Sequence, residues 1–416
     1  MKLADVRKLE RVYVFKGEEL AGSITRTRDG SIFEYDAHYL ERAGTEDLAS
    51  VAFSLPLRKE PHQTYGDNLH PFFAGLLPEG RRLSALISAL KTSADDMFSL
   101  LAGAGSDCIG DVFISHDITI NETDNSQSSF DLDQALFVDL FEQSIASTEF
   151  SERKRDISVP GVQPKISAEM ISFPIAIKKN HKRYLLKLAP QSYPKLIENE
   201  HFFMKMAHGC GIECAKTSIV HDRNGTPGLL VERFDRCWQD ESKTIKRLHQ
   251  EDACQFLARY PQDKYRLSMR QIADGIVKYS SSPIIETAKL LKLTAFSYLI
   301  ANGDLHAKNI SLLQPHNSSS IILSPAYDLL STLPYGDEQM ALELERRRTK
   351  LFPKHFIIWA ERSAVKRAAA ISILCKLCGL ARPYVEQLEE IGLEPKKTNY
   401  LRQTMLKRIS QLSGEP

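Results

Sequence analysis

The feature that most constrains this chain is a polar octapeptide, "NGDLHAKN" at residues 302–309, between two apolar segments. The segment before it, "PIIETAKLLKLTAFSYLIA", is apolar at helical spacing, and the segment after it, "ISLL", is typical of a short strand. A surface turn needs one Asn or Gly and one or two other polar residues. This stretch carries more functional groups than a turn requires, so it predicts a polar loop with a chemical role between two buried elements.

Composition indicates a globular protein with no charge asymmetry. The 416 residues are 43% hydrophobic and 26% charged, and 54 Lys+Arg against 53 Asp+Glu leave a formal charge of +1. This balance gives no indication of binding to nucleic acid or to a membrane surface. The N-terminal segment lacks the apolar core of a signal peptide, no apolar run approaches 18 residues, and seven scattered cysteines suit a reducing compartment. We therefore expect a cytoplasmic protein with no membrane association.

The pattern changes along the chain from strand-like to helical. Residues 10–57 alternate apolar and polar in short runs, with a hairpin turn at Asp29-Gly30, and short helices follow from about residue 70. After a polar linker at 119–130, two strand-like segments are followed by a helix ended by Gly209 or Gly211. A second hairpin turns at Asn224-Gly225, and the chain is mainly helical after about 245.

These changes predict an α+β, two-lobed chain with a β-rich half and an α-rich half. We expect four parts: 1–118, a sheet with short helices; 119–156, a linker and helix; 157–244, β-rich; and 245–416, all-helical except for short strands beside the octapeptide. Cys375 and Cys378 form a CxxC, but "ISILCKLCGL" predicts an apolar helix rather than a metal or redox site.

Two acidic residues and an amide follow the spacing of a known catalytic loop. Asp304 and Asn309 are five positions apart, as are the Asp and Asn of the kinase loop D-x-x-x-x-N. A phosphoryl acceptor hydroxyl needs a carboxylate that takes its proton, and Mg²⁺ needs oxygen ligands such as the Asp328 carboxylate further on. Each Asp alone could simply cap a turn or a helix. Their order and spacing together favour a phosphoryl-transfer centre.

The upstream half contains a lysine in an unusual place. Lys187 lies mid-strand in "YLLKLAP", where a charged side chain needs a partner. Glu200 on the next predicted helix could be that partner, as in the Lys–Glu pair of kinases. The alternative is that Lys187 lies on the exposed face of an edge strand.

Two further segments fit a nucleotide site. The loop "SVPGVQPK" at 158–165 lies between predicted strands and can offer backbone N–H groups to phosphate oxygens, although Pro160 and Pro164 each remove one. The segment "LLVERFDR" at 229–236 lies between the two halves, where a hinge would meet adenine through its backbone.

The chain resembles the HipA-like serine/threonine kinases, the toxin components of bacterial toxin–antitoxin pairs. The motifs that carry the resemblance follow in the family's order: "FFAGLLPEG", "FSLLAGAGSDCIGDV", "ISVPGVQPK", "LLKLAP", "ENEHFFMKMA", "VERFDR", "LHQEDACQ", "NGDLHAKN" and "YDLLS". The resemblance implies a kinase-like fold with a β-rich N-terminal lobe, an added N-terminal subdomain and a helical C-terminal lobe, with ATP and Mg²⁺ between the lobes. It implies Asp304 as the catalytic base and Asn309 and Asp328 as metal ligands.

The residue pattern indicates a phosphate loop, the Lys187–Glu200 pair and a hinge, and the resemblance implies the individual residues of the nucleotide site. Its residues are Pro160, Gly161, Val162, Gln163, Pro164 and Lys165 in the phosphate loop, Lys187 and Glu200, then Glu232, Arg233 and Phe234 in the hinge, His306, Ala307, Lys308 and Asn309 in the catalytic loop, and Tyr327, Asp328, Leu329 and Leu330 after it.

The resemblance also implies partners. These are a HipB-like helix-turn-helix antitoxin, through which DNA is contacted only indirectly, and a protein substrate such as an aminoacyl-tRNA synthetase. Ser158, two residues before the phosphate loop, is expected to be phosphorylated by the enzyme itself. Two alternatives remain open at this point: a small-molecule phosphotransferase of the aminoglycoside-kinase type, and an inactive scaffold that binds an antitoxin.

Overall fold

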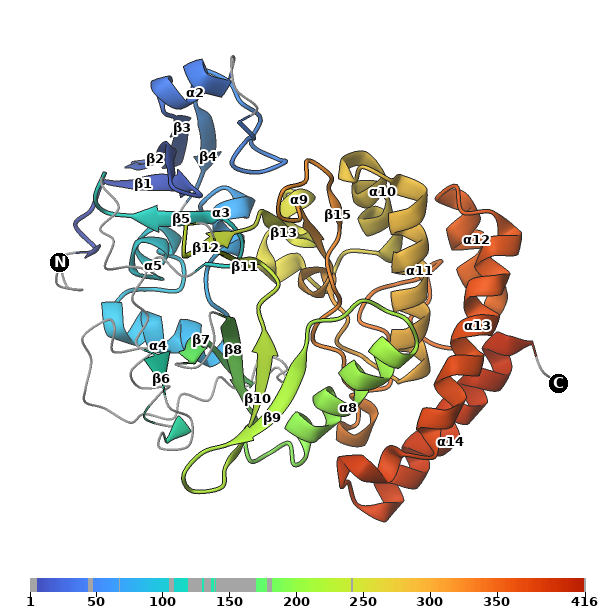
Figure 1. Ribbon diagram of the computed structural model, residues 1–416. Helices are drawn as coiled ribbons and strands as arrows, with labels where there is room; N and C mark the ends of the chain where they lie inside the picture. Colours follow the sequence, from blue (N-terminus) through green and yellow to red (C-terminus); the bar gives the residue numbers. More distant parts are fainter. Residues whose placement is uncertain are drawn as a thin grey trace. The chain divides into compact units, whose positions relative to one another are not determined.

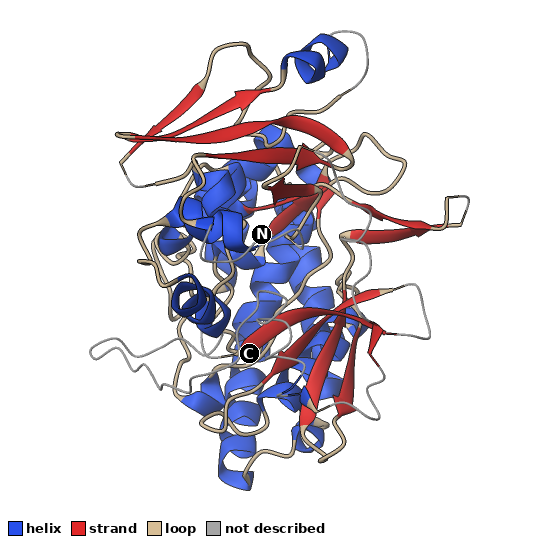
Figure 2. Cartoon of the chain, turned by 90° about the vertical axis from the view of Figure 1, so that its left-hand side faces the viewer, coloured by secondary structure: helices blue, strands red, loops and turns tan. Residues whose placement is uncertain are grey.

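The computed structural model describes residues 6–43, 48–66, 68–104, 108–118, 129–130, 136–137, 139, 170–177, 182–240 and 242–414. The chain divides into two compact units. The first comprises Met1–Leu186, His221–Thr226 and Asp235–Pro261, and the second comprises Lys187–Val220, Pro227–Phe234 and Gln262–Pro416. Strands are concentrated before residue 253, and the chain is mainly helical after it (Figure 1, yellow to red; Figure 2, strands in red). The α+β class with a helical C-terminal part is confirmed.

The first unit contains a five-stranded antiparallel sheet with the strand order β4-β3-β2-β1-β5. Its strands are β1 (Arg11–Lys16), β2 (Glu19–Thr27), β3 (Gly30–Tyr35), β4 (His62–Tyr65) and β5 (Val112–Ser115). Alternation along β1 buries Val12 and Val14, which is why this segment forms a strand with one face on the core. The hairpin predicted near Asp29 is confirmed, because Thr27 pairs with Gly30 across a loop of two residues.

Four short helices accompany this sheet: α2 (Ala37–Ala43), α3 (Pro71–Gly75), α4 (Gly80–Leu90) and α5 (Met97–Ala104). Phe72 and Phe73 of α3 belong to the same buried cluster as Phe33 of β3 and Leu101 of α5. The other described elements of this unit are β6 (Ser129–Phe130) parallel to β7 (Ile171–Ile177), the hairpin of β11 (Arg236–Gln239) and β12 (Thr244–Arg247), β13 (Gln250–Asp252) and α9 (Ala253–Phe256). A reciprocal capping box between Asp252 and Gln255 starts α9.

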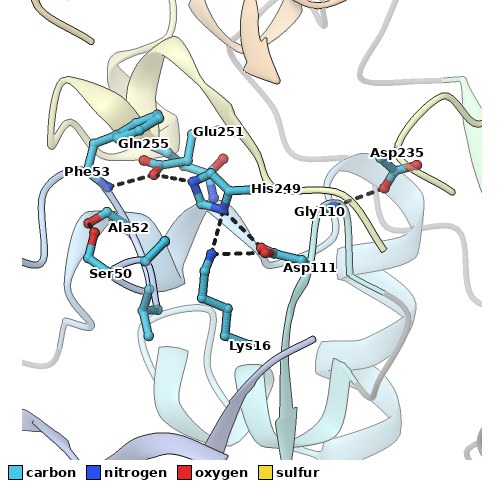
Figure 3. A network of polar contacts seen from close by, with 12 residues as sticks. Lys16, Ser50, Ala52, Phe53, Gly110, Asp111, Asp235, His249, Glu251 and Gln255 are labelled. Carbon is cyan, nitrogen blue, oxygen red and sulfur yellow. Dashed lines mark hydrogen bonds and ion pairs between the residues drawn. The ribbon is translucent and has the colours of Figure 1, made fainter. Parts of the chain in front are cut away.

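A network of charged groups joins the end of β1, the residue before β5, and β13 with the residue before it (Figure 3). Lys16 Nζ lies 2.9 Å from Asp111 Oδ2 and 3.0 Å from His249 Nδ1. The same ring nitrogen is 2.9 Å from Asp111 Oδ1, and Nε2 is 3.0 Å from Glu251 Oε1. Glu251 Oε1 also accepts a hydrogen bond of 2.7 Å from the Phe53 amide. These contacts give each buried charge an opposite partner, as burial requires.

The second unit begins in β8 (Arg183–Leu188), a strand of the second five-stranded sheet, whose order is β6-β7-β8-β10-β9. The helix α8 (Leu196–Gly209) follows, and it ends at one of the two predicted glycines. The strands β9 (Thr217–His221) and β10 (Pro227–Glu232) follow α8. The turn between them contains Gly225 at φ +79°, which only glycine adopts easily, as the predicted Asn-Gly turn requires.

The rest of the second unit is mostly helical. Its helices are α10 (Met269–Tyr279), α11 (Pro283–Leu299), α12 (Pro353–Arg362), α13 (Arg367–Val385) and α14 (Pro395–Ser413). Short 3₁₀ turns lie at Pro261–Asp263, Ala307–Asn309, Leu333–Tyr335 and Leu388–Ile391, and β14 (Ser311–Leu313) pairs with β15 (Ile322–Leu323). Ser268 and Gln271 form the capping box of α10, and Pro283 opens α11 at the position where proline is tolerated.

The helix α13 contains Cys375 and Cys378, so the predicted apolar helix is confirmed, and neither cysteine forms a disulfide. Among the described residues, α13 is the one helix that is long and apolar enough, by length and composition, to cross a membrane, although no apolar run near 18 residues was expected. It contacts α11, α12 and α14, and Leu374, Leu377 and Ala381 are buried. These contacts are those of a helix in a packed bundle.

Candidate functional site

Lys187 is held between two carboxylates. It lies on β8 and is 6% exposed, which excludes the exposed face of an edge strand. Its Nζ is 2.6 Å from Glu200 Oε1 of α8 and also forms an ion pair with Asp328 Oδ1. Burial would lower the pKa of Lys187, but the Asp328 and Glu200 carboxylates outweigh it and the net pKa is raised. The ammonium therefore stays charged, and it can attract an anion such as phosphate.

Glu200 is the more deeply buried of the two carboxylates. Burial raises its pKa to about 7, although the attraction of Lys187 opposes that shift. Its Oε2 atom is buried and has no hydrogen-bond partner among the described residues. Helix α8 presents Glu200 toward β8 because Met204 and Ala207, about one turn and two turns further on, are buried on the same side of the helix.

Asp304 lies in the loop directly after α11 and is 1% exposed. Its amide donates to Asn302 Oδ1 at 2.8 Å, and its carbonyl accepts from His306 N at 2.8 Å. Gly303 is required by close approach, because a Cβ there would lie 2.8 Å from the Asp337 carboxylate and from the Gln339 carbonyl. Asp304 Oδ2 is buried and unpartnered among the described residues, so a carboxylate oxygen remains available.

Asn309 and Asp328 offer the oxygen atoms that a divalent cation needs. Asn309 Nδ2 donates to the Asp304 carbonyl at 2.9 Å, which fixes the amide so that its Oδ1 remains free to accept. Asp328 has a side chain 30% exposed and a φ of +56°, a strained conformation that Asp tolerates better than most residues. No group of three or more His, Cys, Asp or Glu suited to a metal occurs in the described part of the chain. The donor set fits Mg²⁺, which binds through one or two protein oxygens together with phosphate and water.

The segment after Asp328 is fixed by side chains that sequence reasoning missed. Asn199 of α8 donates to the Ser331 carbonyl and accepts from the Ser331 amide, both at 2.9 Å. The Thr332 hydroxyl accepts from the Gly303 amide at 2.7 Å. These bonds join α8, the Asp304 loop and the Asp328 segment. Asn199 lies inside the motif "ENEHFF", so its place beside Glu200 was a signal that could have found it.

The predicted hinge reaches the same region. Glu232 ends β10, and its amide donates to the Lys216 carbonyl at 2.8 Å. The Phe234 ring lies 5.8 Å from the Tyr327 ring, and the Tyr327 hydroxyl donates to the Lys308 carbonyl at 2.8 Å. Arg233 is buried, as are Ala307, Leu329 and Leu330, so the side chains of the two leucines serve the core.

The structure thus brings together most of the predicted site residues. Those that lie in this region of the second unit are Lys187, Glu200, Glu232, Arg233, Phe234, Asp304, His306, Ala307, Lys308, Asn309, Tyr327, Asp328, Leu329 and Leu330. The phosphate loop from Pro160 to Lys165, and Ser158, lie outside the described residues. Their assignments, and the roles given to the others, stay predictions.

Comparison with known families identifies the class of the chain. Residues 157–383 match the HipA-like C-terminal domain, and residues 12–115 match the HipA N-terminal domain. The first match alone covers more than half of the 416 residues. The chain therefore belongs to the HipA-like family, as the resemblance predicted.

Individual relatives agree with this membership. The chain is 30% identical over 344 residues to "Putative kinase Y4mE" of Sinorhizobium fredii, covering 79% of this chain and 80% of that protein. It is 27% identical over 293 residues to the serine/threonine-protein kinase toxin HipA of Shewanella oneidensis, covering 66% of each. The solved complex of HipA, HipB and operator DNA from Shewanella oneidensis contains a chain with a TM-score of 0.71 at 20% identity, with 97% of each chain covered. The last comparison establishes the fold.

Proposed function

We propose that this chain is an ATP- and Mg²⁺-dependent serine/threonine protein kinase that acts as a toxin. The observation that carries the proposal is Lys187, buried and charged between Glu200 and Asp328. A lysine paired with a helix glutamate beside a metal-binding aspartate is the arrangement with which kinases hold ATP phosphates. The relatives named as kinases support it.

In this proposal each residue has a separate task. The Lys187 ammonium attracts the phosphates of ATP. Asp304 Oδ2 accepts the proton of the acceptor hydroxyl as that oxygen attacks the terminal phosphorus, whose bond to the β,γ-bridging oxygen breaks so that ADP leaves. Asn309 Oδ1 and the Asp328 carboxylate would hold Mg²⁺, which when bound neutralises phosphate charge. Phe234 and Tyr327 would lie beside the adenine, and residues 160–165 would cover the phosphates.

The wider assignments belong to the same proposal. The parts 1–118, 119–156, 157–244 and 245–416 would be the N-terminal subdomain, the linker, and the β-rich and helical parts of a kinase. A HipB-like antitoxin is the expected partner, supported by the solved HipA–HipB–operator complex. The substrate would be a translation component such as an aminoacyl-tRNA synthetase in the cytoplasm, and Ser158 a site of autophosphorylation.

The test is transfer of label from γ-labelled ATP into proteins of a desalted cell lysate, with Mg²⁺. Wild-type chain should label at least one protein band, and Asp304→Asn, which keeps the shape but removes the base, should transfer about 10²–10⁴-fold more slowly. Label that enters only small molecules would favour a small-molecule phosphotransferase, and no label at all a scaffold. Equal transfer by wild type and Asp304→Asn would show that Asp304 is not the base.

A further inference from the structure

Tyr265 contacts the proposed catalytic base, although it belongs to none of the motifs in the sequence. It lies in the short segment before α10, thirty-nine positions from Asp304, and its side chain is partly exposed. Its hydroxyl donates a hydrogen bond of 2.7 Å to Asp304 Oδ1. Tyr265 is therefore close enough to act on the carboxylate and accessible enough to lie beside an incoming substrate.

The two oxygens of Asp304 are in different situations. Oδ1 is bound by the Tyr265 hydroxyl, whereas Oδ2 is buried and has no hydrogen-bond partner among the described residues. A carboxylate on a single bond can rotate and exchange its two oxygens. A donor on one oxygen fixes that rotation and leaves the other oxygen to accept the proton of the acceptor hydroxyl.

Tyr265 is itself held from two sides. Its ring meets the His306 ring edge to face, with centroids 5.1 Å apart and an interplanar angle of 82°. The carbonyl of the preceding Lys264 accepts a bond of 3.1 Å from the Ala307 amide, and Arg348 Nη2 donates to the Tyr265 carbonyl at 3.0 Å. The hydroxyl therefore occupies a fixed place relative to the catalytic loop, since both the ring and the backbone of Tyr265 are anchored.

We propose that Tyr265 is a positioning residue for phosphoryl transfer, which orients the Asp304 carboxylate so that Oδ2 faces the acceptor hydroxyl. The inference rests on the proposed function, because it needs Asp304 to be the base. Misplacing a catalytic group by about 1 Å can lower the rate about 10²-fold, so loss of the fixed Asp304 orientation should slow phosphoryl transfer measurably.

The test is Tyr265→Phe, which removes one oxygen atom and keeps the ring against His306 and both backbone bonds. With γ-labelled ATP and the lysate protein that wild type labels, we expect kcat to fall about 10- to 100-fold. The KM for ATP and the calorimetric Kd for ATP should not change, because Tyr265 acts on the base and not on the nucleotide. The double variant Tyr265→Phe, Asp304→Asn should be no slower than Asp304→Asn alone, since the hydroxyl acts only through that carboxylate.

Tyr298→Phe is the matched control. Tyr298 lies in the same unit, and its buried hydroxyl donates to the Leu351 carbonyl at 3.1 Å, away from Asp304. It should lose some thermal stability and keep its kcat. If circular dichroism shows that Tyr265→Phe is unfolded, Arg348→Ala is tested instead. This variant removes the hydrogen bond to the Tyr265 carbonyl and keeps the Tyr265 hydroxyl. A lower kcat with an unchanged Kd for ATP is again expected.

The possible failures can be told apart. A wild-type kcat in folded Tyr265→Phe, or an additive loss in the double variant, overturns the positioning role while the proposed function stands. Equal activity of wild type and Asp304→Asn overturns the proposed function itself, whatever Tyr265→Phe does.

Discussion

At the scale of single residues, both the backbone conformation and the charge of Asp328 decide which substitution tests its role. Its φ of +56° is tolerated by Asp and Asn but disfavours Ala. Asp328→Asn therefore keeps the backbone and removes the negative charge from a proposed Mg²⁺ ligand. We expect Mg²⁺ to strengthen the binding of ATP to wild type. The factor by which Mg²⁺ raises ATP affinity should be about tenfold smaller in the variant, a difference of about 1.4 kcal/mol.

The measurement is a calorimetric titration with ATP, with and without Mg²⁺. Asp274→Asn is the control, because Asp274 also belongs to the second unit but pairs with Arg270 on the solvent-exposed surface of α10. An unchanged Mg²⁺ dependence in Asp328→Asn would show that Asp328 is no metal ligand.

Asp304, Asn309 and Asp328 could be predicted as site residues because they follow, within one stretch, the order and spacing of a kinase catalytic loop and its metal-binding Asp. Lys187 was found because a charge inside an apolar strand needs a partner. Tyr265 gave no such signal: one tyrosine in a polar segment fits a surface loop equally well. Its contact with Asp304 arises only when the chain folds back on itself over the intervening residues.

At the scale of elements, the local patterns were sufficient for two of the hairpins and for several helices. Strand alternation predicted β1 to β3, and the glycines and apolar spacing predicted α8. The charged network of Lys16, Asp111, His249 and Glu251 was not predictable in this way. Lys16 is 95 positions from Asp111 and 233 from His249, and no periodicity links such distant charges.

That network makes the stability of the first unit depend on pH. Burial and Lys16 lower the pKa of His249, but Asp111 and Glu251 outweigh them and the net pKa is raised above its ordinary value of 6.5. A raised folded-state pKa adds stability that is fully present below pH 6.5 and is lost as the pH rises through the folded value. The Asp111 pKa is lowered, because Lys16 and His249 outweigh its burial, so Asp111 does not titrate in this window.

We therefore expect His249→Gln to destabilise the chain by about 1–3 kcal/mol at pH 6 and by less at pH 8. Thermal melting at pH 6 and pH 8 measures the loss of stability of the whole chain. Hydrogen exchange of the amides in β1 and 248–253 shows whether the loss lies in the first unit. The comparison is between wild type and variant at each pH, because other histidines also titrate. His208→Gln, an exposed position on α8, should show no such difference. An equal loss at pH 6 and pH 8 would contradict a protonated His249.

At the scale of the whole molecule, the sequence order of β-rich and helical segments predicted the fold class. It predicted two lobes but not the segments that each unit contains, because the first unit includes 221–226 and 235–261 from the middle of the chain. Every described site residue belongs to the second unit, whereas the proposed phosphate loop and Ser158 precede it in sequence. Regulation through Ser158 would therefore act on ATP binding from a segment remote in sequence from the catalytic loop.

The expected event is phosphorylation of Ser158 by the chain's own activity. A phosphoserine carries about −1.5 to −2 charges, which beside the phosphate loop would repel ATP or draw the loop toward Arg153, Lys154 and Arg155. Trypsin offers a clean readout, because the peptide after Arg155, "DISVPGVQPK", has Ser158 as its one hydroxyl side chain. Wild-type protein expressed in cells should give this peptide about 80 Da heavier, the mass of one phosphoryl group, and Asp304→Asn should give it unmodified. Ser158→Ala should remain active and stay active through prolonged incubation with ATP, while wild type slows as the peptide is modified. An unmodified peptide from active wild type given ample ATP would refute the switch.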